Sequence, residues 1–109
     1  MSDQLLQELF EVLQSRKGAN PKESYTAKLY DKGKGKICQK VGEEASEVII
    51  AALSEGKQEL ILESADLLYH LLVLLSHCDV NISEVMDELC RRQSISGIEE
   101  KKKRSKDKD

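Results

Sequence analysis

Three acidic residues lie close together near the middle of this 109-residue chain, in the segment KVGEEASEVIIAA (40–52). In a helix, Glu44 and Glu47 are three residues apart and Glu43 and Glu47 are four apart, so their Cβ atoms share one face at about 5–6 Å. Like charges at this spacing repel by about a few tenths of a kcal/mol per pair. Taken alone, the segment is equally typical of a solvated acidic face.

A second acidic pair, Glu63 and Asp66, lies in the far more apolar segment ESADLLYHLLVLL (63–75). A helix that is apolar almost all round is buried almost all round. Carboxylates removed from water must take up protons, pair with a basic side chain or bind a metal ion. Two interpretations of the pair therefore remain, a buried or half-buried salt bridge to Lys or Arg and a metal site.

The two acidic segments are separated by a short stretch around Gly56, which favours an antiparallel helical hairpin. Facing acidic stripes in such a hairpin bring together four carboxylates, namely Glu44, Glu47, Glu63 and Asp66. An all-oxygen anionic cluster suits a hard cation. Mg²⁺ usually shares its coordination shell with phosphates of a substrate, so the pattern predicts Mg²⁺ as cofactor and a phosphate-bearing small molecule as ligand.

The remaining periodicity predicts an all-α fold of four to five helices within one domain. Between the first and second helices, residues 24–36 are Gly/Lys-rich and are expected to be irregular, with at most one helical turn. Residues 1–98 are expected to form the domain, and the charged residues 99–109 a solvated, disordered tail. The helices are expected at about 3–15, 37–54, 58–78 and, after a cap at Asn81 or Ser83, up to about Gln93.

Composition argues against several classes of partner. The net charge is only -3, and the basic run at the end of the chain is typical of a solvated terminus, so no nucleic-acid partner is expected. The apolar stretch 60–75 contains Glu63, Asp66 and His70, which disfavours a membrane span. The three cysteines form no CxxC pair and no signal peptide is recognisable, which predicts a cytoplasmic protein with reduced thiols.

The third helix has more apolar circumference than a chain of this length can cover. We therefore expect a homodimer in which helices of two chains complete a bundle.

The acidic motif resembles that of a known superfamily. Glu43-Glu44-x-x-Glu47 followed by Glu63-x-x-Asp66 is similar to the metal motif of the all-α, MazG-like nucleoside triphosphate pyrophosphohydrolases. Over about residues 5–104 the chain resembles, more closely, the phosphoribosyl-ATP pyrophosphohydrolases of histidine biosynthesis. The strings that carry this likeness are SYTAKL (24–29), KVGEEASEVIIAA (40–52), ESADLLYHLLVLL (63–75) and SGIEEK (96–101). The Lys-rich end after Glu100 departs from the family pattern.

The resemblance implies Mg²⁺-dependent hydrolysis of phosphoribosyl-ATP to phosphoribosyl-AMP and pyrophosphate. It carries the metal ligands over to Glu44, Glu47, Glu63 and Asp66. Glu43 or Glu47 would take the proton of the attacking water, and the residues do not decide between them. The chain has neither the length nor the cysteine spacing for a fused zinc-binding cyclohydrolase domain, so a single activity is expected.

Basic residues are the candidates for binding substrate phosphates. Lys28, Lys36 and Lys40 lie on or before the first acidic segment, and Lys40 is one helical turn ahead of Glu44, where a salt bridge is the alternative role. Arg91, next to Arg92, is a candidate for the phosphate of the second ribose, although a surface helix end explains both arginines equally well.

Two further features of the sequence stay open. The run KGKGK (32–36) lacks the spacing of a Walker A loop and is either a closing loop or a plain flexible one. His70 is either a contact behind the metal ligands or a satisfied core histidine.

Other functions remain in competition. A pyrophosphohydrolase of non-standard or excess nucleoside triphosphates would share the metal site and differ in its substrate. A di-iron carboxylate bundle would need Glu-x-x-His, whereas Asp66 stands three residues after Glu63. A non-enzymatic helical interaction module would tolerate neutralisation of the carboxylates.

Overall fold

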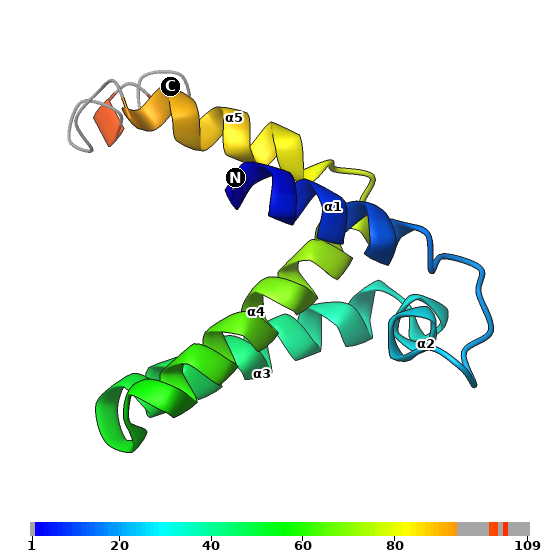
Figure 1. Cartoon of the computed structure of the whole chain (residues 1–109), viewed down its shortest axis with the longest axis horizontal. Coiled ribbons are helices and arrows are strands. Elements are labelled where there is room, and N and C mark those ends of the chain that lie inside the picture. The colour runs from blue at the N-terminus through cyan, green and yellow to red at the C-terminus, as the bar shows by residue number, and fades with distance from the viewer. Residues whose placement is uncertain (1, 94–100, 103, 105–109) are drawn as a thin grey trace.

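The computed structural model describes residues 2–93 together with 101, 102 and 104. Within these residues the chain is helical and contains no strand, which confirms the all-α prediction (Figure 1). The elements are α1 (Ser2–Gln14), α2 (Tyr25–Lys32), α3 (Lys34–Ile50), a π-helical turn η1 (Ala51–Glu55), α4 (Lys57–His77) and α5 (Ile82–Gln93). The boundary predicted between the domain and the tail, at residues 98 and 99, lies outside the described residues.

The predicted hairpin is present. Helices α3 and α4 lie side by side and antiparallel, and η1 and Gly56 join them (Figure 1). Gly56 has φ 127°, a conformation that favours glycine, and its N–H donates to the Ala51 carbonyl at 3.2 Å. Helix α4 matches the predicted helix 58–78 to within one residue at each end.

The prediction for residues 24–36 is wrong. Residues Tyr25–Lys32 form the helix α2, which Ser24 caps by accepting a hydrogen bond from the backbone N–H of Ala27 at 3.1 Å. Its buried face supplies tertiary packing that a Gly/Lys-rich sequence does not reveal. Only Gly33, at φ 96°, interrupts the chain before α3, which therefore begins three residues earlier than predicted.

Helix α5 begins with a reciprocal cap. Asn81 Oδ1 accepts the N–H of Ser83 at 2.9 Å, and Glu84 Oε2 accepts the N–H of Asn81 at 2.9 Å. Asn81 is thus the cap, rather than Ser83.

The hydrophobic core lies at one end of the hairpin. There, α1 and α5 pack together against the second half of α4, and α2 packs near the start of α3 (Figure 1). The buried apolar side chains of this core are Phe10, Leu13, Leu29, Ile37, Leu72, Val73 and Ile82. The core thus fixes the base of the hairpin, and the acidic residues of α3 and α4 lie farther along the two helices.

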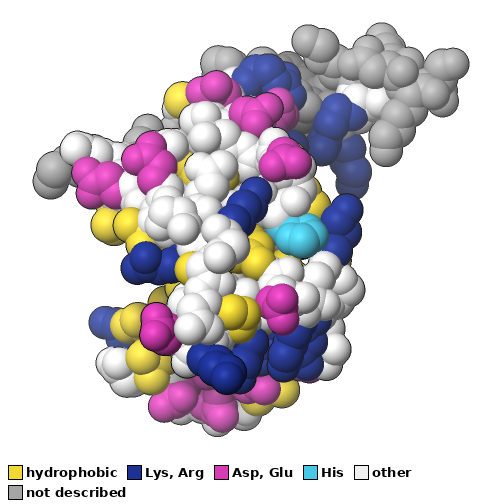
Figure 2. Space-filling view, turned by 90° about the vertical axis from the view of Figure 1, so that its right-hand side faces the viewer, with side chains coloured by type: hydrophobic (Ala, Val, Ile, Leu, Met, Phe, Trp, Pro, Cys, Tyr) yellow, Lys and Arg dark blue, Asp and Glu magenta, His cyan; other side chains and the backbone are white. Residues whose placement is uncertain are grey.

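The free end of the hairpin is covered far less. The large apolar side chains exposed there are Ile49, Ile50, Leu53, Ile61, Leu62 and Leu68. By length and composition alone, α4 is the one described helix that could cross a membrane, and only 22% of its apolar window is buried. On the face that Figure 2 shows, Lys and Arg side chains gather on the lower part of the surface, around α2.

Candidate active site

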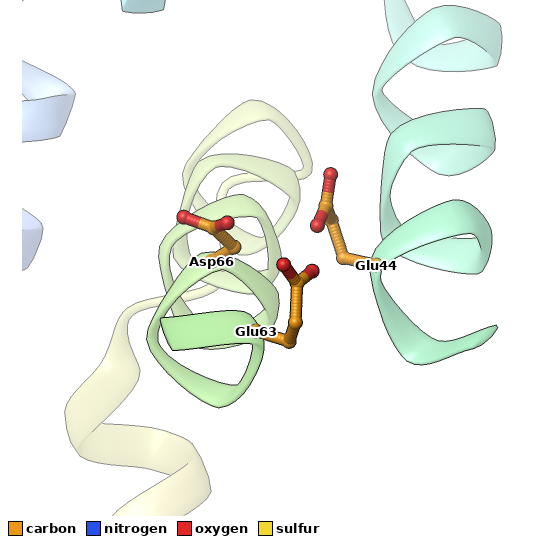
Figure 3. A group of neighbouring side chains, drawn as sticks. All are labelled: Glu44, Glu63 and Asp66. Carbon is orange, nitrogen blue, oxygen red and sulfur yellow. The ribbon is translucent and has the colours of Figure 1, made fainter. Parts of the chain in front are cut away.

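Three carboxylates converge between the hairpin helices. Glu44 projects from α3, and Glu63 and Asp66, three residues apart, project from α4 toward the same space (Figure 3). One oxygen of each lies within 4.8 Å of the others. Glu44 and Glu63 are half-buried and Asp66 is exposed. This acidic trio is an all-oxygen donor set of the kind that binds Mg²⁺.

The electrostatics of the trio favour a cation. Desolvation raises the pKa of the Glu63 carboxyl, and the neighbouring charges of Glu47, Asp66 and Glu44 raise it further. Three mutually repelling carboxylates at this separation favour a divalent ion, because its charge attracts all three and offsets most of their repulsion. The residues present therefore fit a divalent metal.

Two other predicted site residues lie just outside the trio. Glu47 is exposed and is not among the three clustered side chains, although its charge acts on Glu63. Glu43 is also exposed, and it accepts hydrogen bonds from Gln39 at 2.8 Å and from Lys40 at 3.4 Å. Both hydrogen bonds lower the pKa of the Glu43 carboxyl, and the bond from Gln39 has the larger effect. The structure thus brings together three of the four predicted metal ligands.

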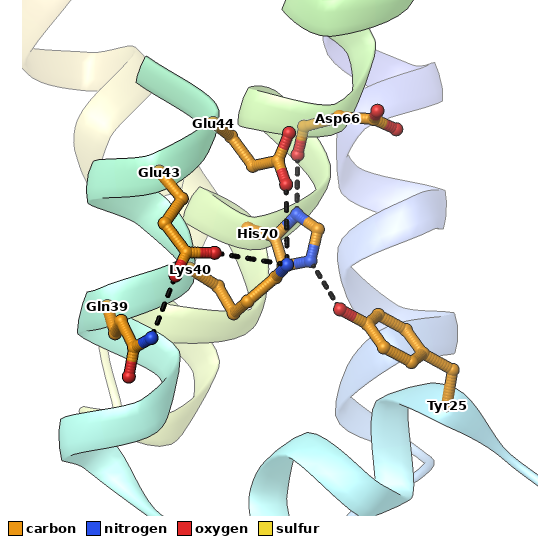
Figure 4. A network of polar contacts seen from close by, with 7 residues as sticks. All are labelled: Tyr25, Gln39, Lys40, Glu43, Glu44, Asp66 and His70. Atoms are coloured by element: carbon orange, nitrogen blue, oxygen red, sulfur yellow. Dashed lines mark hydrogen bonds and ion pairs between the residues drawn. The ribbon is translucent and has the colours of Figure 1, made fainter. Parts of the chain in front are cut away.

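Lys40 lies at the edge of the trio. Its ammonium is 3.4 Å from Glu43 Oε2 and 3.6 Å from Glu44 Oε1, so the salt bridge given as its alternative role is present (Figure 4). Desolvation alone would lower the pKa of Lys40, but the Tyr25 hydroxyl and then the carboxylates of Glu43 and Glu44 together outweigh it, so the pKa is raised. A positive charge therefore already lies beside the carboxylates of Glu43 and Glu44.

A tyrosine–histidine pair lies behind the trio (Figure 4). His70 is buried, and its Nδ1 is 2.7 Å from the backbone carbonyl oxygen of Asp66. A carbonyl can only accept, so Nδ1 carries the proton. In the neutral ring Nε2 is then the acceptor, and the Tyr25 hydroxyl donates to it at 2.8 Å. His70 is thus a buried histidine with both ring nitrogens satisfied, and it also contacts the backbone of Asp66, a predicted metal ligand. Both interpretations from the sequence are therefore partly correct.

Sequence reasoning did not single out Tyr25. Burial raises the pKa of its hydroxyl, while the nearby Lys40 charge opposes that shift. The available signal was its place in SYTAKL, directly after the Ser24 cap, but nothing local links it to a histidine 45 residues away.

The other basic candidates lie farther from the carboxylates. Lys28 is exposed on α2, and Lys36 is half-buried in the first turn of α3, where its charge contributes to the lowered pKa of Glu43. Arg91 lies on α5, and its Nη2 is 2.6 Å from Glu88 Oε2. Their roles in substrate binding stay predictions.

Comparison with known proteins identifies the family. The family model described as phosphoribosyl-ATP pyrophosphohydrolase matches residues 6–93, most of the chain. This chain belongs to the phosphoribosyl-ATP pyrophosphohydrolase family.

Curated relatives agree with this assignment. A phosphoribosyl-ATP pyrophosphatase of Paramagnetospirillum magneticum is 60% identical over 102 residues, which cover 94% of each chain. Proteins of the same name from Geotalea daltonii and Geobacter sulfurreducens are 51% and 52% identical, over 97% and 94% of this chain and 100% and 95% of their own length. The family resemblance inferred from the acidic motif is therefore confirmed. As a phosphoribosyl-ATP pyrophosphohydrolase family member, the chain carries its acidic trio well inside the matched region.

Proposed function

We propose that this protein hydrolyses phosphoribosyl-ATP to phosphoribosyl-AMP and pyrophosphate, a step of histidine biosynthesis, with Mg²⁺ as cofactor. The observation that carries the proposal is the convergence of Glu44, Glu63 and Asp66 in a chain that matches this family over residues 6–93. Relatives named for this activity span nearly the whole chain.

The residues divide the work electrostatically. A bound Mg²⁺ would neutralise phosphate oxygens and acidify a bound water. Glu44, Glu63 and Asp66 would hold it, and Glu47 would join them through one oxygen after rotation of its exposed side chain, which leaves its other oxygen to accept a proton. Lys40 would bind an oxygen of the substrate triphosphate, which is cut between its first and second phosphates. Such phosphoryl transfer depends mainly on positioning and charge neutralisation.

Glu47 is the better proton acceptor of the two candidates. Gln39 and Lys40 occupy Glu43 and lower its pKa, which makes it a weaker base. The Glu47 carboxylate makes no hydrogen bond or ion pair with any described residue, and it lies close enough to raise the pKa of Glu63.

The working form is a cytoplasmic homodimer. Ile61, Ala65 and Leu68 recur at helical spacing on α4, and all three are exposed in the single chain. A second copy of the hairpin offers a matching apolar face and would complete a four-helix bundle.

The deciding experiment measures turnover of phosphoribosyl-ATP beside a panel of ordinary and non-standard nucleoside triphosphates, with and without Mg²⁺. Phosphorus NMR should detect pyrophosphate and phosphoribosyl-AMP, and only with the metal. Orthophosphate as the first product would refute the proposed bond cleavage. Faster turnover of another triphosphate would favour the second candidate, a pyrophosphohydrolase of non-standard nucleotides.

A further inference from the structure

A separate cavity opens beside the acidic site. It has a volume of about 440 Å³ and is lined by Arg16, Asn20 and Glu23 from the connection between α1 and α2, by Tyr25, and by Tyr69 of α4. Pockets for small ligands have volumes of about 300–1000 Å³. The cavity is therefore large enough for a sugar phosphate.

Tyr25 is the wall shared by the cavity and the acidic site. It lines the cavity, while its hydroxyl bonds His70 and interacts electrostatically with Lys40, Glu44 and Asp66 (Figure 4). One tyrosine side chain thus borders both sites.

Arg16 and Lys17, two adjacent basic residues beside the cavity, differ in their contacts. The Lys17 ammonium donates to the Ser76 carbonyl at 2.6 Å and lies 3.5 Å from Asp79 Oδ1, so it ties the end of α1 to the end of α4. Arg16 is exposed and lines the cavity, and its side chain makes no hydrogen bond or ion pair with any described residue. Its guanidinium is free to bind phosphate in two-pronged geometry.

The rest of the lining suits a ribose. Glu23 carries a carboxylate that can accept from ribose hydroxyls, as acidic residues do in dinucleotide sites. The Asn20 side-chain oxygen accepts the N–H of Lys22 at 2.9 Å, which leaves its amide hydrogens free to donate. The rings of Tyr25 and Tyr69, with centroids 6.3 Å apart, form an aromatic wall on the side of the acidic site.

We propose that this cavity binds the phosphoribosyl group that distinguishes phosphoribosyl-ATP from ATP, with its phosphate on Arg16 and its hydroxyls at Asn20 and Glu23. The inference rests on the proposed function, which assigns the triphosphate to the acidic trio. It gives the second phosphate a partner other than Arg91, whose guanidinium is paired with Glu88.

The test compares two products as ligands, because phosphoribosyl-AMP carries the extra group and AMP lacks it. Calorimetry in Mg²⁺ would measure both dissociation constants for wild type, Arg16→Ala and Lys22→Ala. Lys22 is the matched control, an exposed cation of the same connection that does not line the cavity. Loss of a charged hydrogen-bonding partner should weaken phosphoribosyl-AMP binding by about 10- to 100-fold in Arg16→Ala. AMP binding should stay within about twofold of wild type, and Lys22→Ala should change neither constant.

Equal affinity of the wild type for both products would overturn the inference, as would an Arg16→Ala variant that binds phosphoribosyl-AMP normally. Arg16→Lys should recover part of the affinity, because it restores the charge without the planar fork. Binding does not require turnover. A wild type that distinguishes the products but fails to hydrolyse phosphoribosyl-ATP would therefore contradict the proposed function alone.

Discussion

The two halves of α4 are both rich in leucine but have very different surroundings, and the charged residues Lys57, Glu59, Glu63 and Asp66 all lie in the first half. In residues 69–77 four side chains are buried, because α1, α2 and α5 cover this half. In residues 57–68 none is buried, and the helix contacts little besides α3 and η1. The acidic trio takes two of its members from the open half. The covered half of α4 thus contributes mainly to stability, and the open half supplies the residues proposed to bind the ion.

The largest contrast between the halves should appear in stability. Leu72→Ala opens a cavity in the core and should lower the free energy of unfolding by about 2–5 kcal/mol. Leu62→Ala, in the open half, should cost less than about 1 kcal/mol at protein concentrations where the chain is monomeric. Urea titrations of both variants measure the difference, and similar losses would remove the division between the halves.

Activity should show the opposite pattern. Glu63→Gln removes one carboxylate of the trio and should lower kcat/KM for phosphoribosyl-ATP by about 100- to 1000-fold, with helical content unchanged. Glu59→Gln, one turn earlier on α4 and outside the trio, is the control and should stay within about threefold of wild type. Full activity of Glu63→Gln would remove the proposed metal site.

Self-association should depend on the open half. Ile61→Lys places a charge on its exposed apolar stripe and should weaken the dimer by about 100-fold, as measured by sedimentation over a concentration series. Leu5→Lys changes an exposed leucine of α1 and should leave the association intact. A dimer that survives Ile61→Lys would place the interface elsewhere.

The boundary between the halves is marked by His70. Tyr25→Phe keeps the ring but leaves the buried Nε2 of His70 without its donor, which should cost about 1–2 kcal/mol of stability. Thermal unfolding monitored by circular dichroism gives the value. An unchanged melting temperature would mean that the hydrogen bond contributes nothing measurable.

The smallest effect is a pH dependence. Without metal, the pKa of Glu63 is raised in the folded state, so the fold binds extra protons there and its stability rises as pH falls through that pKa. Metal-free Glu63→Gln should therefore melt above wild type at about pH 7, and the gap should shrink toward about pH 5. A gap that widens on acidification would contradict the assigned shift.

The sequence predicted those features of the fold that depend on the spacing of neighbouring residues. The bounds of α4 and the hairpin follow from helical periodicity and from Gly56. The trio follows in part, because the three-residue spacing of Glu63 and Asp66 is set by the helix itself, whereas the rotation of α3 that leaves Glu47 outside is set by packing between helices. Helix α2 was missed because a helix of 8 residues is not stable without tertiary contacts, which the local sequence does not reveal.

Helix α4 also constrains how this chain can change in length. It runs unbroken from the acidic pair to the core, so one residue inserted between Asp66 and Leu72 would turn one part against the other by about 100°. Either the carboxylates would leave the space that faces Glu44, or the core side chains would rotate out of their packing. Substitutions within this segment can be absorbed one at a time, whereas a single insertion or deletion would damage ion binding or folding.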